Sequence, residues 1–439
     1  MSNEQQGRPG AMKPFERLES EVRGYSRSFP KVFANAQGAL LYDETGRAYI
    51  DFLSGAGSLN YGHNNPHLKS SIVRYLDHDG LVHGLDMAST AKRAFLESFR
   101  EIILKPREFD YKIQFTGPTG TNAVEAAFKL ARKVTGRTAI VSFTNGFHGV
   151  SLGSLAATGN SHFRNAAGVP LQNTVFMPYD GYLGSGLDTL DYFEKAIQDR
   201  SSGLDLPAAA IVETVQGEGG VNVAGFKWLK RLERICTQYG ILLIVDDIQV
   251  GCGRTGTFFS FEPAGISPDI ITLSKSISAF GLPMAIVLMR PELDRWKPSE
   301  HNGTFRGNNL AFVTATKAIE MYWRDDRLSN RVVAAGERMR IRLESMCNQF
   351  PGMCDRVRGR GLIQGLVFKK PELAATVSRL AFEAGLIIET SGSRSEVLKL
   401  LPSLLIDDET LSRGLDLIES AMERASRIQI ALEKTAVGA

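Results

Sequence analysis

The sequence predicts an α/β fold with a mostly parallel central sheet covered by helices on both faces. Between residues 111 and 289, short apolar runs alternate with helical patterns such as 123–134 and 226–239. Almost uninterrupted apolar runs separated by helices are typical of parallel strands that are buried on both faces. The predicted strands are residues 111–115, 139–143, 208–213, 241–246, 270–274 and 284–289.

A chain of 439 residues is long enough to divide its core between two lobes. We expect residues 1–60 to form a flexible N-terminal arm and the N-terminal part of a small lobe. Residues 61–310 would form a large domain that contains the sheet. Residues 311–439 would form a linking helix, predicted from the amphipathic stretch 310–346, and a C-terminal small domain of mixed α+β structure. The polar first thirteen residues predict the arm and contain no secretory signal.

Composition excludes several classes of partner. A net charge of +3 in 439 residues predicts no nucleic-acid surface, and the longest apolar stretches are strand-sized and too short to cross a bilayer. The four cysteines lack the paired spacings of a zinc site and are too few for a disulfide framework. We therefore expect reduced thiols, a cytoplasmic location and no metal site, with the thiols at Cys236, Cys252, Cys347 and Cys354.

Two polar residues, Asp246 and Lys275, follow neighbouring apolar runs. Ligands of open α/β sheets bind outside the carboxyl ends of the strands. A lysine that bonds to an aldehyde and an aspartate that pairs with a pyridinium nitrogen are the groups that pyridoxal 5'-phosphate requires. Because a lysine after a strand usually only solvates a loop, the surrounding motifs must decide.

The turn at residues 115–122 has the sequence Phe-Thr-Gly-Pro-Thr-Gly-Thr-Asn and opens a predicted helix. Its free amides, its hydroxyl groups and the positive end of the helix dipole suit a phosphate. No Gly-Lys-Ser/Thr follows, so the turn is not a Walker A loop. Taken alone, it could equally be an ordinary capped turn.

Residues 251–256, Gly-Cys-Gly-Arg-Thr-Gly, match the dinucleotide fingerprint G-x-G-x-x-G, and Asp269 lies where a ribose-binding acid would be expected. The fingerprint requires a helix to begin at the third glycine. The segment after Gly256 is aromatic, reaches a proline and has no helical period. This pattern excludes an NAD-dependent dehydrogenase.

Further polar or aromatic residues follow other strands. Phe147 suits stacking on a flat cofactor ring, Ile248 would cover the opposite face, and Gln249 is placed to donate to a phenolate oxygen. Phe147 and His148 could instead be a packed phenylalanine and a hydrogen-bonded histidine of a turn. The glycine-rich loops 213–220 and 301–308 are either solvated turns or parts of the same site.

In this chain order, the motifs resemble the class III, fold-type I pyridoxal-phosphate aminotransferases, and the resemblance runs from about Phe15 to the C-terminal helix. It implies a homodimer or higher homo-oligomer with small-molecule amino-acid and oxo-acid substrates and an active site at the subunit interface. Lys275 and Asp246 would be catalytic, and Thr304 would reach the phosphate of the neighbouring subunit. The residues that the resemblance assigns to the cofactor are Gly120, Thr121, Phe147, His148, Asp246, Ile248, Gln249, Lys275 and Thr304.

Residues 59–66, 83–88, 116–122 and 301–309 resemble one subgroup, the diaminobutyrate 4-aminotransferases of ectoine biosynthesis. This subgroup transfers an amino group between glutamate and L-aspartate 4-semialdehyde. Several positions depart from the general pattern as that subgroup does: Asn122 replaces Glu, Arg306 replaces Gly and Asn309 replaces Pro. A potassium requirement is also implied, although the sequence contains no recognisable ligand set.

Substrate carboxylates need a fixed cation. Lys399 stands where related ω-aminotransferases have an arginine that pairs with the glutamate matching Glu218. Lysine keeps the charge but lacks the bidentate geometry of a guanidinium. The resemblance therefore leaves Glu218, Lys399 and Arg306 as substrate-binding residues, with Arg394 as a further candidate.

Four alternatives remain. The substrate could be another ω-amine, such as ornithine or 4-aminobutyrate, or the same diaminobutyrate could feed a siderophore or peptide pathway. An aminomutase would need no 2-oxoglutarate. A nonenzymatic cofactor-binding protein would bind the cofactor without turnover.

Overall fold

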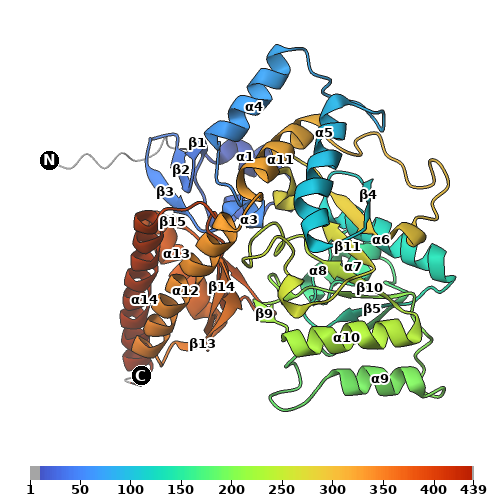
Figure 1. Ribbon diagram of the computed structural model, residues 1–439. Helices are drawn as coiled ribbons and strands as arrows, with labels where there is room; N and C mark the ends of the chain where they lie inside the picture. Colours follow the sequence, from blue (N-terminus) through green and yellow to red (C-terminus); the bar gives the residue numbers. More distant parts are fainter. Residues whose placement is uncertain (1–9, 438–439) are drawn as a thin grey trace.

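The computed structural model describes residues 10–437 and contains a central seven-stranded sheet (Figure 1). In spatial order the strands are β4 (Lys112–Phe115), β12 (Ile286–Met289), β11 (Ile270–Leu273), β10 (Leu242–Asp246), β7 (Ala209–Val212), β5 (Ile140–Phe143) and β6 (Thr174–Met177). Most of these strands are parallel to their neighbours: β10 pairs parallel with β7 and β11, and β5 pairs parallel with β6 and β7. This arrangement confirms the predicted fold class.

Two features of this sheet were not predicted. β12 was expected as a strand, but it runs antiparallel to β4 and β11. The connection from β11 contains only the short 3-10 helix Lys275–Ser278, whereas a parallel return usually needs a crossover helix. β6 was missed because three of its four residues are only partly buried, so its apolar run is short.

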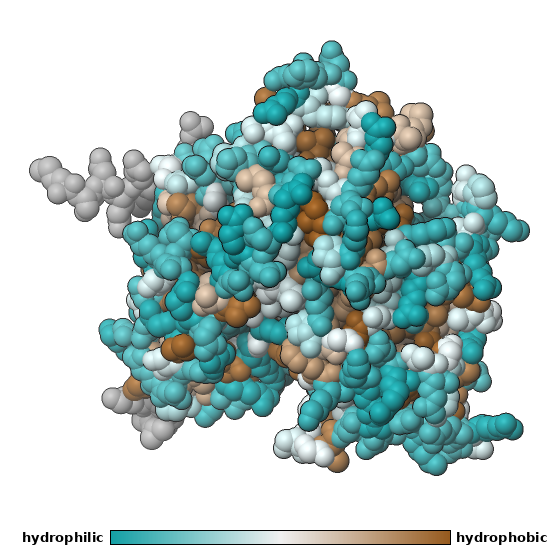
Figure 2. Space-filling view, in the orientation of Figure 1, coloured by the Kyte–Doolittle hydropathy of each residue, from teal (hydrophilic) through white to brown (hydrophobic). Residues whose placement is uncertain are grey.

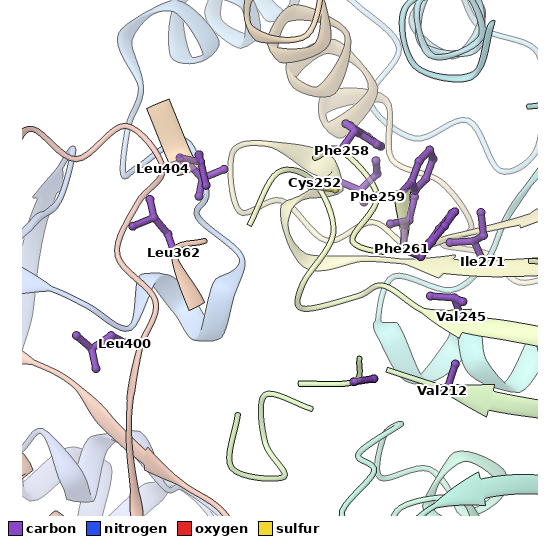
Figure 3. Close-up of a cluster of buried hydrophobic side chains, with 14 of the residues drawn as sticks. Val212, Val245, Cys252, Phe258, Phe259, Phe261, Ile271, Leu362, Leu400 and Leu404 are labelled. Carbon is purple, nitrogen blue, oxygen red and sulfur yellow. The ribbon is translucent and has the colours of Figure 1, made fainter. Parts of the chain in front are cut away.

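Alternate residues of the strands pack on opposite faces of the sheet. Val212, Val245 and Ile271 join the cluster that includes buried residues of α10 (Phe226–Tyr239), and Figure 3 shows Ile271 beside Phe261. The other face packs on α6 (Gly120–Thr135), whose buried residues cluster with Ile140, Ile211, Ile244, Ile270 and Val287.

The segment after Gly256 has no α-helix. It turns, enters the 3-10 helix Glu262–Ala264, and buries Phe258, Phe259 and Phe261 in the core. The predicted absence of a dinucleotide-binding helix is therefore confirmed.

Arg254 of the same segment is fully buried and joins three parts of the chain. Its guanidinium donates to the backbone oxygen of Leu362 at 3.0 Å, to that of Pro402, and to Oδ1 of Asn60 at 2.5 Å. Burial lowers the pKa of Arg254 to about 9, so the side chain remains charged at neutral pH.

We expect Arg254→Ala to lower the free energy of unfolding by about 3–5 kcal/mol, because it leaves buried acceptors without their donor. Chemical denaturation of the two proteins measures the change. Arg427→Ala, at a side chain that is 78% exposed, is the control and should cost less than about 0.5 kcal/mol. A similar loss for both variants would contradict the structural role of Arg254.

The predicted linking helix over 310–346 is two helices, α11 (Asn309–Tyr322) and α12 (Arg327–Gln349). Trp323 lies in the break, is buried, and donates from Nε1 to the hydroxyl of Tyr61 at 2.7 Å. This anchor and the polar residues that follow it end the first helix, so the expectation of one helix was wrong.

The N- and C-terminal regions share one small sheet, in which β15 pairs parallel with β3. Its strands are β1 (Phe33–Gln37), β2 (Leu40–Asp43), β3 (Ala48–Asp51) and β15 (Leu386–Ile387). A second, antiparallel sheet contains β13 (Cys354–Arg360), β14 (Ile363–Phe368), β17 (Val397–Leu400) and β16 (Glu389–Ser391), beside α12, α13 (Pro371–Ala384) and α14 (Asp408–Val437).

The predicted flexible arm falls mainly on residues 1–9, which lie outside the described part; helix α1 begins at Lys13. The remaining elements are α1 (Lys13–Leu18), α2 (Tyr25–Ser28), α3 (Ser54–Gly57), α4 (Pro66–Asp77), α5 (Thr90–Ser98), the π-helix Phe99–Leu104, α7 (Leu152–Ala156), α8 (Ser161–Arg164), β8 (Val215–Gln216), β9 (Asn222–Val223), α9 (Leu190–Gln198) and the 3-10 helices Lys105–Arg107, Asn165–Ala167 and Pro291–Leu293.

The face in Figure 2 is mostly hydrophilic; hydrophobic residues show between the helices at the top, around α4, α5 and α11, and at scattered places on the left and lower right. Within residues 10–437, no helix has the length and hydropathy needed to cross a membrane. The described residues also contain no cluster of three His, Cys, Asp or Glu side chains that could hold a metal ion.

Candidate active site

A cavity of about 300 Å³ lies at the carboxyl ends of the central strands. Eight of the nine residues that the sequence assigned to a cofactor line it, and Thr304 is the exception. The lining residues are Thr119, Gly120, Thr121, Phe147, His148, Gly149, Val150, Glu213, Glu218, Asp246, Ile248, Gln249 and Lys275.

Strand register brings the aspartate and the lysine into this cavity. Asp246 ends β10 directly beside Thr272 of the parallel strand β11, and Lys275 follows three residues later. Lys275 has a φ of 48°, in the left-handed region that side chains other than glycine rarely adopt. Such strain concentrates at functional sites, where the surrounding structure maintains it.

The environment of Lys275 lowers the pKa of its amine. Burial lowers the pKa of Lys275, and the positive charge of Lys399 acts in the same direction. Glu218 and Asp246 oppose the shift without reversing it. A lowered pKa increases the fraction of amine that can act as a nucleophile or a base.

Asp246 is only 4% exposed and is held at both oxygens. Its Oδ2 lies 2.7 Å from Nδ1 of His148. Its Oδ1 accepts from the backbone N–H of Ile248 and from the hydroxyl of Thr272, both at 3.2 Å. These contacts fix the carboxylate at the cavity wall, and His148, itself buried, serves as its support.

The turn before α6 presents free donors. Asn122 Oδ1 accepts from the backbone N–H of Thr119 at 3.2 Å, and no described residue accepts from the amides of Gly120 and Thr121. The hydroxyl of Thr121 is already bonded to Ser151 Oγ at 2.6 Å. A phosphate would therefore be bound here by amides and the helix dipole.

Gly120 also permits close packing, because an added Cβ would lie 3.0 Å from Cδ1 of Ile248. Phe147 is fixed by its backbone N–H, which donates to Oε2 of Glu213 at 2.9 Å.

The side-chain NH2 group of Gln249 is already fully used. Gln249 Nε2 donates one hydrogen to the backbone oxygen of Ala56 at 3.0 Å and the other to Oε1 of Glu218 at 2.9 Å. The predicted donation from Gln249 to a cofactor oxygen would require one of these bonds to open.

Lys399 and Glu218, which the sequence paired by resemblance, are in contact. Lys399 Nζ lies 2.5 Å from Oε1 of Glu218 and 3.1 Å from Oε1 of Glu389. Burial opposes charge on Lys399, but the two carboxylates outweigh it and raise the pKa of Lys399. Burial likewise acts to raise the pKa of Glu218, yet Lys399 and Lys275 prevail and lower it to about 2.

Three residues of this region were not assigned from the sequence. Burial raises the pKa of Glu213 well above its usual range, and Asp246 adds to the shift. Glu389 contacts Lys399, and the hydroxyl of Tyr25 donates to Oε2 of Glu389 at 3.2 Å. The apolar run 386–388 directly before Glu389 was a usable signal for Glu389, whereas nothing local marks Tyr25.

Thr304 and Arg306 do not meet Lys275 within one chain. They line a different cavity, of about 320 Å³, together with Lys92 and Phe305. Arg306 Nη1 lies 3.7 Å from Oδ2 of Asp86. Arg394 is exposed at the turn between β16 and β17, so the structure brings only Lys399 among the candidate cations beside Glu218.

Residues 23–422 match the family described as aminotransferase class-III. The chain belongs to the class III aminotransferases. It is 64% identical to a diaminobutyrate–2-oxoglutarate transaminase of Bordetella parapertussis over 94% of this chain and 95% of that one. It is 60% identical to the enzyme of the same name from Halomonas elongata, over 93% of this chain and 98% of that one.

Solved structures show the same fold. An ornithine aminotransferase from Toxoplasma gondii, described with partial occupancy of pyridoxal phosphate at its active site, matches with a TM-score of 0.83 and 25% identity, over 97% of this chain and 96% of that chain. A transaminase from a marine Virgibacillus matches with a TM-score of 0.85 and 21% identity, over 96% and 100% of the two chains. This aminotransferase therefore has the predicted fold-type I architecture.

Family membership implies pyridoxal phosphate as the cofactor. The cavity suits that molecule in three respects: free amides at the start of α6 for the phosphate, the fixed carboxylate of Asp246 for the ring nitrogen, and the amine of Lys275 for the aldehyde carbon.

Proposed function

We propose that this class III aminotransferase transfers an amino group between glutamate and L-aspartate 4-semialdehyde, forming 2-oxoglutarate and L-2,4-diaminobutyrate. The proposal depends mainly on relatives named diaminobutyrate–2-oxoglutarate transaminase, which are 64% and 60% identical to this chain over nearly their whole length.

When bound, pyridoxal phosphate supplies an electron-withdrawing ring that stabilises negative charge at the substrate carbon. We assign its phosphate to the amides of Gly120 and Thr121, and its ring to the space between Phe147 and Ile248. Asp246 holds a proton at the ring nitrogen, and His148 orients Asp246 through the 2.7 Å contact. Residues 61–310 form the cofactor-binding domain in this proposal.

Lys275 has two roles in the proposed reaction. Its amine would hold the cofactor at the aldehyde carbon in the resting enzyme. Once free of the cofactor, the same amine would accept the proton from the substrate carbon and give it back, and the lowered pKa of Lys275 suits that role.

Lys399 and Glu218 serve the two substrates in turn. A carboxylate of glutamate can take the place of Glu218 on the buried ammonium of Lys399. The 2.5 Å pair can remain closed when the donor is an ω-amine. Lysine offers a single ammonium for this exchange in place of the bidentate fork of an arginine.

We propose a homodimer in which Thr304 and Arg306 of one subunit reach the active site of the other. Both residues lie in a cavity apart from Lys275, and exposed Leu85, Met87 and Phe305 line that same cavity. Exposed hydrophobic side chains gathered at one site are typical of a protein interface.

We infer further that the product feeds ectoine biosynthesis in the cytoplasm, where the four free thiols would remain reduced. A potassium requirement rests on the subgroup resemblance alone.

The test is product analysis of the purified holoenzyme with 2-oxoglutarate and a panel of diaminobutyrate, ornithine and 4-aminobutyrate. Glutamate formed preferentially from diaminobutyrate, with the semialdehyde as co-product, would support the proposal. A preference for another amine would keep the Lys275 chemistry and replace the substrate. Turnover that needs no 2-oxoglutarate would indicate an aminomutase.

A further inference from the structure

The short element α3 is a left-handed turn. Its four successive residues, Ser54 to Gly57, have φ angles of 48°, 58°, 55° and 87°. Two of them, Ser54 and Ala56, are not glycine, and such residues keep a left-handed conformation only where neighbouring contacts hold it. Lys275, with its φ of 48°, is a second strained position of the same kind.

One hydroxyl group joins these two strained segments across 219 residues of chain. Ser276 Oγ donates to the backbone oxygen of Gly57 at 2.7 Å and accepts from the backbone N–H of Asn60 at 3.2 Å. We call this pair of contacts the hydroxyl bridge. Ser276 is only 4% exposed and does not line the Lys275 cavity. Because its single hydrogen is already donated, the hydroxyl has none to offer a bound molecule.

Other hydroxyl groups hold the chain on either side of Lys275. Upstream, the hydroxyl of Ser274 donates to the backbone oxygen of Met284 at 3.0 Å. Downstream, the hydroxyl of Thr314 donates to the backbone oxygen of Ser278 at 2.6 Å. The hydroxyl bridge lies between these two points and holds the residue directly next to Lys275.

The turn α3 also contacts the cavity wall opposite the bridge. The backbone oxygen of Ala56 accepts from Nε2 of Gln249 at 3.0 Å, and a Cβ added to Gly57 would lie 3.4 Å from Cγ of the same glutamine. Gln249 lines the cavity together with Lys275. The hydroxyl bridge therefore connects the backbone beside Lys275 to a second part of the same wall.

We propose that Ser276 is a positioning residue, whose hydroxyl bridge holds Lys275 in the left-handed conformation from which its amine enters the cavity. This inference rests on the proposed attachment of the cofactor to Lys275. Loss of the bridge leaves two buried backbone groups, at Gly57 and Asn60, without their partner, and it lets the backbone of Lys275 relax. The amine then no longer lies at a fixed distance from the aldehyde carbon.

The test measures how fast pyridoxal phosphate becomes attached to the full-length apoenzyme, for the wild type and for Ser276→Ala. Nζ of Lys275 forms a C=N bond with the aldehyde carbon, and one water is released. Borohydride, added at set times, reduces this bond, and mass analysis gives the fraction of chain modified at Lys275. We expect the rate of attachment to fall about 10- to 100-fold, the range expected when a reacting group is slightly misplaced.

The pH dependence of the attachment rate provides a second readout. Only the neutral amine attacks the aldehyde, so the rate rises with pH through the pKa of Lys275. A relaxed Lys275 is better solvated, so its pKa rises and the profile moves to higher pH in Ser276→Ala. The charged groups that face Lys275 are the same in both proteins: Glu213, Glu218, Asp246, Glu389 and Lys399.

Ser403→Ala is the matched control. Ser403 is 2% exposed, and its hydroxyl donates to the backbone oxygen of Asn60 at 3.1 Å and accepts from the N–H of Leu405 at 3.2 Å. It does not line the Lys275 cavity. This variant should lower the melting temperature about as much as Ser276→Ala, while the rate of attachment and its pH profile stay those of the wild type.

Ser276→Cys has a similar volume and keeps a weak donor, so its rate should lie between those of the wild type and Ser276→Ala. It carries the test if the alanine variant does not fold. Wild-type rates and pH profiles in both Ser276 variants, or an equal slowing in Ser403→Ala, would overturn the role of Ser276.

The experiment contains no amino donor, so its result is independent of which amine the enzyme prefers. A wild-type adduct that maps to a lysine other than Lys275 would overturn the proposed attachment itself. An adduct at Lys275 with equal rates in all variants would overturn only the role of Ser276.

Discussion

Lys275→Ala is expected to lower turnover by about 10³-fold or more, because it removes both the covalent link to the cofactor and the proton carrier. The backbone position is already fixed by its neighbours in the 3-10 helix Lys275–Ser278, so the fold should persist. Steady-state formation of glutamate from an amine and 2-oxoglutarate measures the loss.

Lys195→Ala on α9 is the control, since this exposed lysine lies outside the cavity, and its activity should be near that of the wild type. The Lys275 variant should also bind pyridoxal phosphate without a covalent link, which borohydride reduction followed by mass analysis detects. Multiple turnover at a near-normal rate would remove Lys275 from its role.

Asp246→Asn is expected to lower turnover by about 10²- to 10³-fold, in the range found when one preorganised electrostatic contact is removed. The amide has the shape of the carboxylate and can still meet His148 if the imidazole changes its tautomer. It has no charge with which to hold a proton at the ring nitrogen. The same glutamate assay, run alongside a thermal melt, separates lost chemistry from lost stability.

The neighbouring Asp247 provides a matched control. Asp247 is equally buried, lies outside the cavity lining and accepts from the N–H of Ser260 at 3.0 Å. Burial raises the pKa of Asp247 to about 7, so asparagine resembles its protonated form. Asp247→Asn should lose less than about tenfold in turnover; comparable losses for the two variants would contradict a specific role for Asp246.

The fold could be predicted where the pattern is local. Apolar runs of four to six residues between helices gave most central strands, because strands buried on both faces can hardly tolerate polar residues. The direction of β12 and the break between α11 and α12 could not be predicted. The first depends on the connection after Lys275, and the second on the contact of Trp323 with Tyr61, some 260 residues away along the chain.

For the active site, the sequence by itself determined the chemical groups at the strand ends. Asp246, Lys275 and the turn at Gly120 follow apolar runs directly, and all parallel strands deliver their carboxyl ends to one edge of a sheet. Spacing along the chain therefore sufficed to bring them together.

Only the tertiary structure decided the surroundings of Lys399. Glu218, Glu389 and Tyr25 come from a loop, an edge strand and a helix far apart in sequence, and they meet at one ammonium because of strand register and lobe packing. It also decided that Thr304 and Arg306 lie apart from Lys275 in a single chain. The local sequence pattern decides which residues lie at the end of a strand. Contacts between distant segments depend instead on packing free energy that is distributed over the whole core.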